Sequence, residues 1–157
     1  MAHGWIAMQR VAPCALMWLG LLWALPLTLC GAILAVAIVL TGGSCRRIAG
    51  APSAWLIQGK FGDWLLQRHP VGAVNAMAIG HLVIAQCGQA NRRILRHELE
   101  HVRQAARWGV FFPLAYLAAS GYAVARGGHS YWDNRFEVAA RRAEGAGCWI
   151  RPGRWDV

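Results

Sequence analysis

Five consecutive residues near the middle of the chain have the types and spacing of a zinc site. His97 and His101 stand four positions apart, and Glu98 directly follows the first histidine. On an α-helix, positions i and i+4 project from the same face, so the two imidazoles can bind one Zn²⁺ between them. Glu98 can then reach a metal-bound water without binding the metal, which is the position of a general base. The pattern predicts zinc as the cofactor and Glu98 as the catalytic residue of a hydrolase.

A catalytic zinc needs a third protein ligand and an open fourth position. In metzincins a glycine and a third histidine follow the motif, but Gln104 and Arg107 stand at those positions, which excludes that class. A glutamate from a later helix is the remaining common pattern, and Glu137 fits it best. The other downstream candidates are His129, Asp133 and Glu144.

Glu137 also has a structural interpretation. Asn134 and Glu137 have the spacing of a helix capping box, and Arg141 lies one turn further along for an ion pair. We favour the ligand role and predict a metal site of His97, His101 and Glu137.

The HExxH pattern followed by a glutamate helix resembles the gluzincin group of zinc metallopeptidases. The region from Gly80 onward resembles more closely a group of small bacterial membrane proteins of unassigned activity, which carry HExxHxxQ and Asn-x-Phe-Glu motifs. The matching residues are Gly80, His81, Gln104, Trp108, Gly109, Tyr116, Asn134, Phe136 and Glu137. The resemblance implies a zincin-like core in which the strand region Ala76–Ala85 binds a peptide substrate by β-augmentation. His81 would then either polarise a substrate carbonyl or be structural.

The composition points to a membrane. Hydrophobic residues make up 57% of the 157 residues and charged residues only 15%, against about 25% charged residues in soluble domains. The net charge of +9 suits anionic headgroups or nucleic acid. Because the apolar content is so high, we expect membrane lipid as a partner, together with a peptide or protein substrate, and no nucleic acid.

The longest stretch without charge, residues 11–45, predicts an N-terminal anchor. We expect a single transmembrane helix over residues 14–40, either tilted or kinked at Pro26, because two spans and a turn need more residues. The predicted organisation is an anchor over residues 1–45, a metallopeptidase domain over 46–148 and a tail over 149–157. More basic residues follow the anchor than precede it, so a bacterial inner-membrane location with a cytoplasmic domain is expected.

The rest of the chain predicts an α+β fold. Short apolar runs at Ala54–Ile57, Trp64–Leu66 and Ala76–Ala85 predict a small antiparallel sheet of about three strands, most clearly at residues 82–84. Asn91 and Gly109 bracket the predicted zinc helix. An apolar hairpin is expected over residues 108–125, and the glutamate helix over 133–144.

A membrane-anchored zinc metallopeptidase that cleaves peptide bonds near the bilayer is the function predicted by these features. The alternatives are a non-catalytic membrane protein of zincin fold that binds metal structurally, and a basic membrane-surface scaffold without metal.

Overall fold

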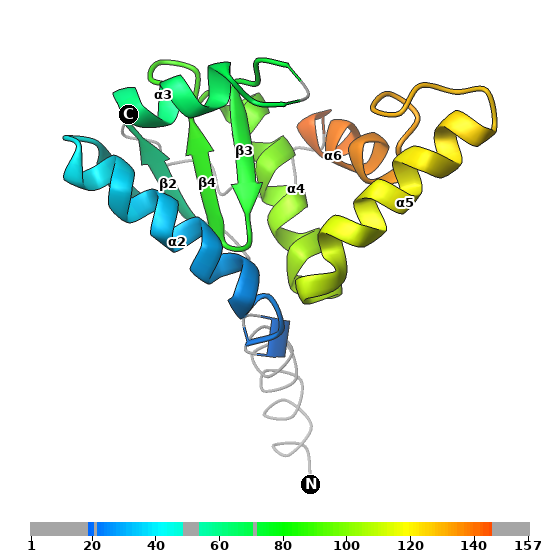
Figure 1. Ribbon diagram of the computed structural model, residues 1–157, viewed down its shortest axis with the longest axis horizontal. Helices are drawn as coiled ribbons and strands as arrows, with labels where there is room; N and C mark the ends of the chain where they lie inside the picture. Colours follow the sequence, from blue (N-terminus) through cyan, green and yellow to red (C-terminus); the bar gives the residue numbers. More distant parts are fainter. Residues whose placement is uncertain (1–18, 21, 49–53, 71, 146–157) are drawn as a thin grey trace, which may run out of the picture.

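A four-stranded sheet organises the part of the chain that the computed structural model describes, residues 19–20, 22–48, 54–70 and 72–145. The strand order is β1-β2-β4-β3, and Figure 1 shows the sheet packed among helices in an α+β fold. The strands are β1 (Ser44–Ile48), β2 (Ala54–Gln58), β3 (Ala76–Ile79) and β4 (Leu82–Ala85). The expected strand at residues 82–84 is therefore confirmed.

The sheet is mixed, so the prediction of an antiparallel sheet is wrong at one pair. β1 pairs with β2 and β3 with β4 in antiparallel register, but β2 and β4 run parallel. A parallel pair needs a crossover connection, and this one contains α3 (Lys60–Gln67). The run Trp64–Leu66, predicted as a strand, belongs to that helix. Gly62 and Leu66 are its buried positions and lie one helical turn apart. The segment therefore buries one face of a helix, and the short apolar run was a misleading sign of a strand.

Helices cover both faces of the sheet. On one face, α2 (Leu25–Leu40) and α3 pack on an apolar cluster. The buried members of this cluster are Ala35, Ile38, Ile57, Leu66, Leu82 and Ile84. On the other face, α4 (Arg92–Trp108) closes a second cluster. Its buried members are Ile48, Ala54, Val83, Leu95, Leu99 and Val102. The sheet is thus a rigid support for the helix that carries the HExxH motif.

The predicted N-terminal transmembrane helix is not shown by the structure. Residues 1–18 and 21 of the expected anchor lie outside the described residues. The helix α2 begins after Ala24, and Pro26 lies in its first turn, where a proline costs no hydrogen bond. It ends before Gly42, as predicted, and buries Gly31, Ala35 and Ile38 against the rest of the protein.

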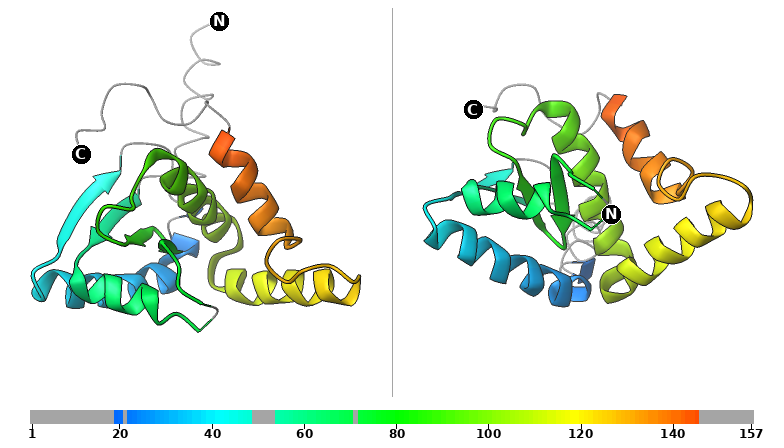
Figure 2. Two further views of the ribbon diagram at one scale, coloured as in Figure 1. Left: turned by 90° about the horizontal axis from the view of Figure 1, so that it is seen from above. Right: turned by 45° about the horizontal axis from the view of Figure 1, so that its top comes forward.

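The chain after α4 turns sharply and continues as a helix, which corrects the predicted hairpin. A short 3₁₀ turn, η1 (Gly109–Phe111), leads into α5 (Phe112–Ala125), and α6 (Arg135–Gly145) returns along α4. Pro113 lies in the first turn of α5 and starts the helix without bending it. In Figure 2, left, α2, α3 and α5 lie along one side of the molecule, with α6 above them in that view.

Among the described ranges, the helical stretch Arg92–Ala125 is the one long and apolar enough to cross a membrane. Only 11% of its apolar window is buried. The stretch is not N-terminal, and it changes direction at Gly109, so length and composition make it weak evidence for a span.

Gly109 makes this turn possible, because its φ of 57° and ψ of −139° lie in a region open almost only to glycine. A Cβ there would also meet the Trp23 side chain at 2.5 Å. We expect Gly109→Ala to lower the free energy of unfolding by about 2 kcal/mol or more, measured by thermal or denaturant unfolding. Gly121→Ala is the matched control, because an added Cβ at this helical position meets no described atom within 4 Å. Equal stability of the two variants would contradict the prediction.

Candidate metal centre

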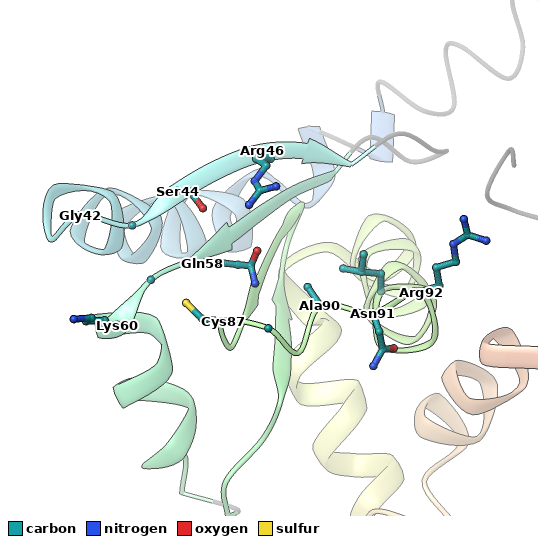
Figure 3. Close-up of a pocket in the computed structure, with 13 residues that line it drawn as sticks. Gly42, Ser44, Arg46, Gln58, Lys60, Cys87, Ala90, Asn91 and Arg92 are labelled. Atoms are coloured by element: carbon teal, nitrogen blue, oxygen red, sulfur yellow. The ribbon is translucent and has the colours of Figure 1, made fainter. Parts of the chain in front are cut away.

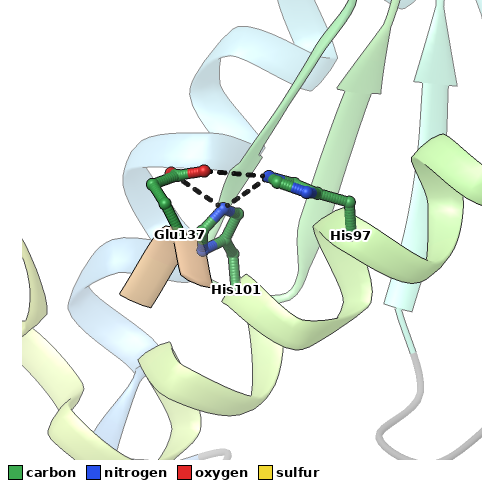
Figure 4. Close-up of side chains that lie close together, drawn as sticks. All are labelled: His97, His101 and Glu137. Carbon is green, nitrogen blue, oxygen red and sulfur yellow. Dashed lines mark hydrogen bonds and ion pairs between the residues drawn. The ribbon is translucent and has the colours of Figure 1, made fainter. Parts of the chain in front are cut away.

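Two histidines of α4 and one glutamate of α6 meet in space. His97 Nε2 lies 3.2 Å from Glu137 Oε2, and His101 Nε2 lies 3.2 Å from Glu137 Oε1. The two Nε2 atoms are 3.1 Å apart. Figure 4 shows the three side chains pointing toward one common point. One donor atom from each lies within 4.8 Å of the others, so the group can hold a metal ion.

Local sequence signals place both helices that carry the triad. Asn91 caps α4 by accepting a hydrogen bond of 3.0 Å from the Ile94 N–H, and Gly109 ends it. Asn134 precedes α6, and its side chain accepts from the Phe136 N–H while donating to the Tyr116 carbonyl and the Ser120 hydroxyl. This fully buried asparagine therefore fixes the start of α6 against α5, which sets the position of Glu137.

Each histidine is also held from its far side. His97 Nδ1 lies 2.9 Å from Glu144 Oε1, and His101 Nδ1 lies 2.9 Å from Gln104 Oε1. A carboxylate or amide oxygen can only accept, so both Nδ1 atoms carry the proton and donate it. With the Nδ1 proton held on the far side, each Nε2 can offer a lone pair to a metal ion in the triad once it gives up its own proton. Metal-bound histidines are oriented by outer hydrogen bonds of this kind.

Glu144 was a candidate ligand in the sequence, and the structure gives it a different place. It lies seven residues after Glu137 and so on the same face of α6, but it contacts the outer nitrogen of His97 and pairs with Arg93. The spacing of seven was the signal available in the sequence. Gln104 had no such signal beyond its place in HExxHxxQ. Its amide nitrogen donates to the Phe136 carbonyl at 3.1 Å, which joins the two helices directly.

The remaining candidates lie elsewhere. Asp133 accepts from the His129 backbone N–H at 2.7 Å, and His129 Nδ1 accepts from the N–H groups of Tyr131 and Trp132. These bonds shape the loop before α6, and neither residue belongs to the metal-binding group. His81 is buried at the turn between β3 and β4, where its Nδ1 lies 3.1 Å from the Thr28 hydroxyl. This contact with α2 indicates a structural role.

The structural interpretation of Glu137 is not what the contacts show. Its oxygens face the two histidines, whereas the Asn134 N–H donates to the Tyr131 carbonyl and Arg141 donates to the Trp132 carbonyl. Neither the capping box nor the ion pair with Arg141 is formed.

Aromatic side chains enclose the group on the side of α5. Tyr116 donates a hydrogen bond of 2.8 Å to Glu137 Oε1, and its ring lies 6.4 Å from that of His101. Phe112 and Phe136 pack edge to face beside it, with centroids 5.4 Å apart. In the sequence only the resemblance points to Tyr116, because nothing in an apolar run marks one tyrosine as the partner of a distant carboxylate.

Charge is balanced inside the group. Burial acts to lower the pKa of His97 and His101, but their hydrogen bonds to Glu137 outweigh it, and both pKa values are raised. Burial acts to raise the pKa of Glu137, but hydrogen bonds from His101 and His97 hold it well below its usual range. The anionic carboxylate of Glu137 thus favours protonated, positively charged imidazoles. A divalent cation that binds between the three side chains must displace the protons on the ring nitrogens that face it.

Glu98 lies close to the triad and is almost completely buried, with 6% of its surface exposed. Burial raises its pKa, although the nearby His101 and His97 act in the opposite direction. The Ala78 backbone N–H, on the edge strand β3, donates a hydrogen bond to it. Glu98 is therefore positioned beside the group without being part of it.

A separate cavity of about 730 Å³ lies at the carboxyl ends of β2 and β4. Its lining includes Arg46, Gln58 and Cys87, which Figure 3 shows around the open end of the sheet. None of the three metal-binding candidates lines it. This cavity is therefore separate from the metal-binding group, and the donor set is the stronger indication of function.

Comparisons of the chain with family models, with curated proteins and with solved structures found no match. The relation to gluzincins therefore stays a prediction, and the case for the site rests on its geometry.

We expect purified protein to bind about one zinc ion per chain, because the part of the chain that the structure describes contains one such group. His97→Ala, His101→Ala and Glu137→Ala should each remove most of it, measured by elemental analysis and by a chromogenic zinc assay. His129→Ala is the control and should keep its zinc, since this histidine lies outside the group. Zinc retention by the Glu137 variant would refute its role as a ligand.

Removing the outer carboxylate should weaken zinc binding without abolishing it. Glu144→Ala leaves the His97 ring free to turn, so we expect a roughly 10- to 100-fold loss of zinc affinity. Glu144→Gln should lose less, because its amide oxygen still accepts from Nδ1. Arg93→Gln breaks the ion pair to Glu144 but spares the bond to His97, and serves as the control. Competition titration with a zinc chelator measures all three, and a loss with Arg93→Gln equal to that with Glu144→Ala would contradict the argument.

Proposed function

We propose that the protein is a zinc metallopeptidase that acts at a membrane. The observation that carries the proposal is that two histidines and one carboxylate converge on a single point, while a hydrogen bond to its Nδ1 holds each histidine from the far side. Two nitrogens and one oxygen are a ligand set used by catalytic zinc sites, which keep a fourth position for water or substrate. A zinc ion held there would lower the pKa of a bound water to about 7.

The protein's own residues supply the remaining roles. Glu98 is the proposed general base, because it lies beside the group and its burial raises its pKa toward the range useful for proton transfer near neutral pH. Glu144, Gln104 and Tyr116 hold the three ligand side chains in orientation. Fixed ligand geometry of this kind removes the cost of reorganisation during reaction.

The edge strand β3 supports a peptide as the substrate. It is the last strand of the sheet, and its Ala78 N–H lies against Glu98. A peptide that aligned along β3 would therefore pass directly beside the proposed base. Strand addition at an exposed sheet edge is a common way to bind extended peptides.

A membrane setting is supported by the two charge-free helices α2 and α5, whose apolar side chains are largely exposed. Membrane lipid is the proposed partner, and the predicted inner-membrane location with a cytoplasmic domain is retained as part of the proposal.

One observation favours a second candidate, a metal site that only braces the fold. Glu98 and Glu137 are both buried, and the described cavity lies away from them. A closed site is typical of structural zinc. Under this alternative the metal would tie α4 to α6 and the protein would catalyse nothing.

Glu98→Gln separates the two candidates. The amide has nearly the same shape but cannot accept the proton, so the variant should keep its zinc and lose peptide cleavage by a factor of at least about 100. To measure this, the protein is reconstituted in a membrane and incubated with a mixed peptide library, and the cleavage products are identified by mass spectrometry. Glu100→Gln, on the same helix but paired with Arg103 on its surface, is the control and should retain activity. If the wild type shows no zinc-dependent cleavage, the peptidase proposal is wrong and the bracing role is supported instead.

A further inference from the structure

Two helices of this protein are apolar on all sides and yet mostly uncovered. Neither α2 nor α5 contains a charged residue. Only Gly31, Ala35 and Ile38 are buried in α2, and only Ala123 in α5. A helix that is hydrophobic all round belongs in a protein core or in lipid. α2 contributes Ala35 and Ile38 to the core, and α5 contributes to neither apolar cluster, so the described chain leaves most of both helices uncovered.

The uncovered side chains form one stripe on each helix. The most exposed aliphatic side chains are Leu25, Leu29, Ile33, Val36 and Leu40 on α2, and Leu114, Leu117 and Val124 on α5. We name these eight residues the apolar face. The helices diverge from a shared corner, where Trp23 packs on Phe111 with ring centroids 6.0 Å apart. The left view of Figure 2 shows both helices along one side of the molecule, so one flat partner can contact both.

The charges around this face suit a lipid surface. Arg126, at the end of α5, lies over the Tyr122 ring and donates to its hydroxyl at 3.0 Å. Arg68, at the end of α3, lies 4.8 Å from the Trp64 ring centre. Arginine and aromatic side chains together are typical of the headgroup region. The one acidic residue of α3, Asp63, instead accepts from the Cys87 N–H at the end of the sheet.

The sheet decides how α2 can lie in a bilayer. This helix contacts all four strands along its length. If it crossed the membrane, the sheet would be carried into the hydrocarbon together with its outer strand β1, which exposes Arg46 and an open row of backbone groups. Open sheet edges do not occur in lipid, because their N–H and C=O groups lose water without gaining partners.

We propose that α2 and α5 lie flat in one leaflet of an anionic bilayer, with the apolar face toward the acyl chains. The inner side of α5 carries Tyr116, which holds Glu137. The metal centre is then about one helix diameter, roughly 10 Å, from the lipid. Resting on the proposed peptidase function, this placement assigns the substrate to peptide segments that lie at the membrane surface.

Depth measurements along each helix test the proposal. All five cysteines are first replaced by serine, and single spin labels are placed at Leu114, Leu117 and Val124 of α5 and at Leu29 and Leu40 of α2. The full chain is reconstituted into vesicles of phosphatidylcholine and phosphatidylglycerol. Accessibility to oxygen, which concentrates in lipid, is compared with accessibility to a water-soluble nickel chelate. Arg142, exposed on α6, is the aqueous control.

Flat helices should give oxygen-accessible labels whose depths agree to within about 5 Å at both ends of each stripe. A helix that crosses the membrane would separate Leu114 and Val124 by about 15 Å in depth. Such a gradient would overturn the proposal, and so would nickel access at the apolar face. Exclusion of both reagents would also overturn it, because a second copy of the chain would then cover the face. None of these outcomes depends on zinc or on cleavage, so this proposal and the proposed function can fail separately.

Discussion

The meeting of Glu137 with the two imidazoles of α4 is the contact on which the rest of the arrangement depends. The ligands come from helices separated by a long apolar segment, so the chain has to leave α4 and return to it. The turn at Gly109 sends α5 away, and Asn134 fixes the point where α6 begins its return. Gln104 then binds His101 and the backbone of Phe136 at once, so the same side chain orients a ligand and joins the helices. The same contacts therefore orient the donor atoms and pack α4 against α6.

The parts of the site that can be predicted from the sequence are those that depend on local patterns along the chain. His97 and His101 belong to one helix with clear capping signals, and Glu137 was found because a third ligand had to come from a later helix. The contacts of Glu144 and Tyr116 depend on how α5 and α6 approach α4, which no periodicity specifies. The sheet was harder still. Short apolar runs predict β-strands but not their order, so the parallel pairing of β2 with β4 could not be predicted. The helix α3 was misread because three adjacent apolar residues suit either structure.

Burial gives the site its character. With Glu98, Glu137 and His101 all largely removed from water, charges there interact more strongly than they would at the surface. The same dryness makes an isolated charge costly, and the three metal-binding candidates are paired accordingly: Glu137 with both imidazoles, and each imidazole also with a carboxylate or an amide. This difference in pairing explains why the pKa of Glu137 falls while that of Glu98 rises, although both glutamates are buried and lie close together. Glu137 accepts hydrogen bonds from both imidazoles and from Tyr116, whereas burial is the largest influence on the pKa of Glu98.

The parallel seam between β2 and β4 has a consequence for the order in which the protein folds. Two antiparallel pairs, β1 with β2 and β3 with β4, are each made of strands that are neighbours along the chain. They can form early as separate hairpins, since little loop entropy is lost in closing them. The seam joins residues such as Leu56 and Val83 across α3 and β3, and both apolar clusters contain residues from its two sides. Neither core is complete until the seam closes, so α4 has its full support only once β2 and β4 are paired.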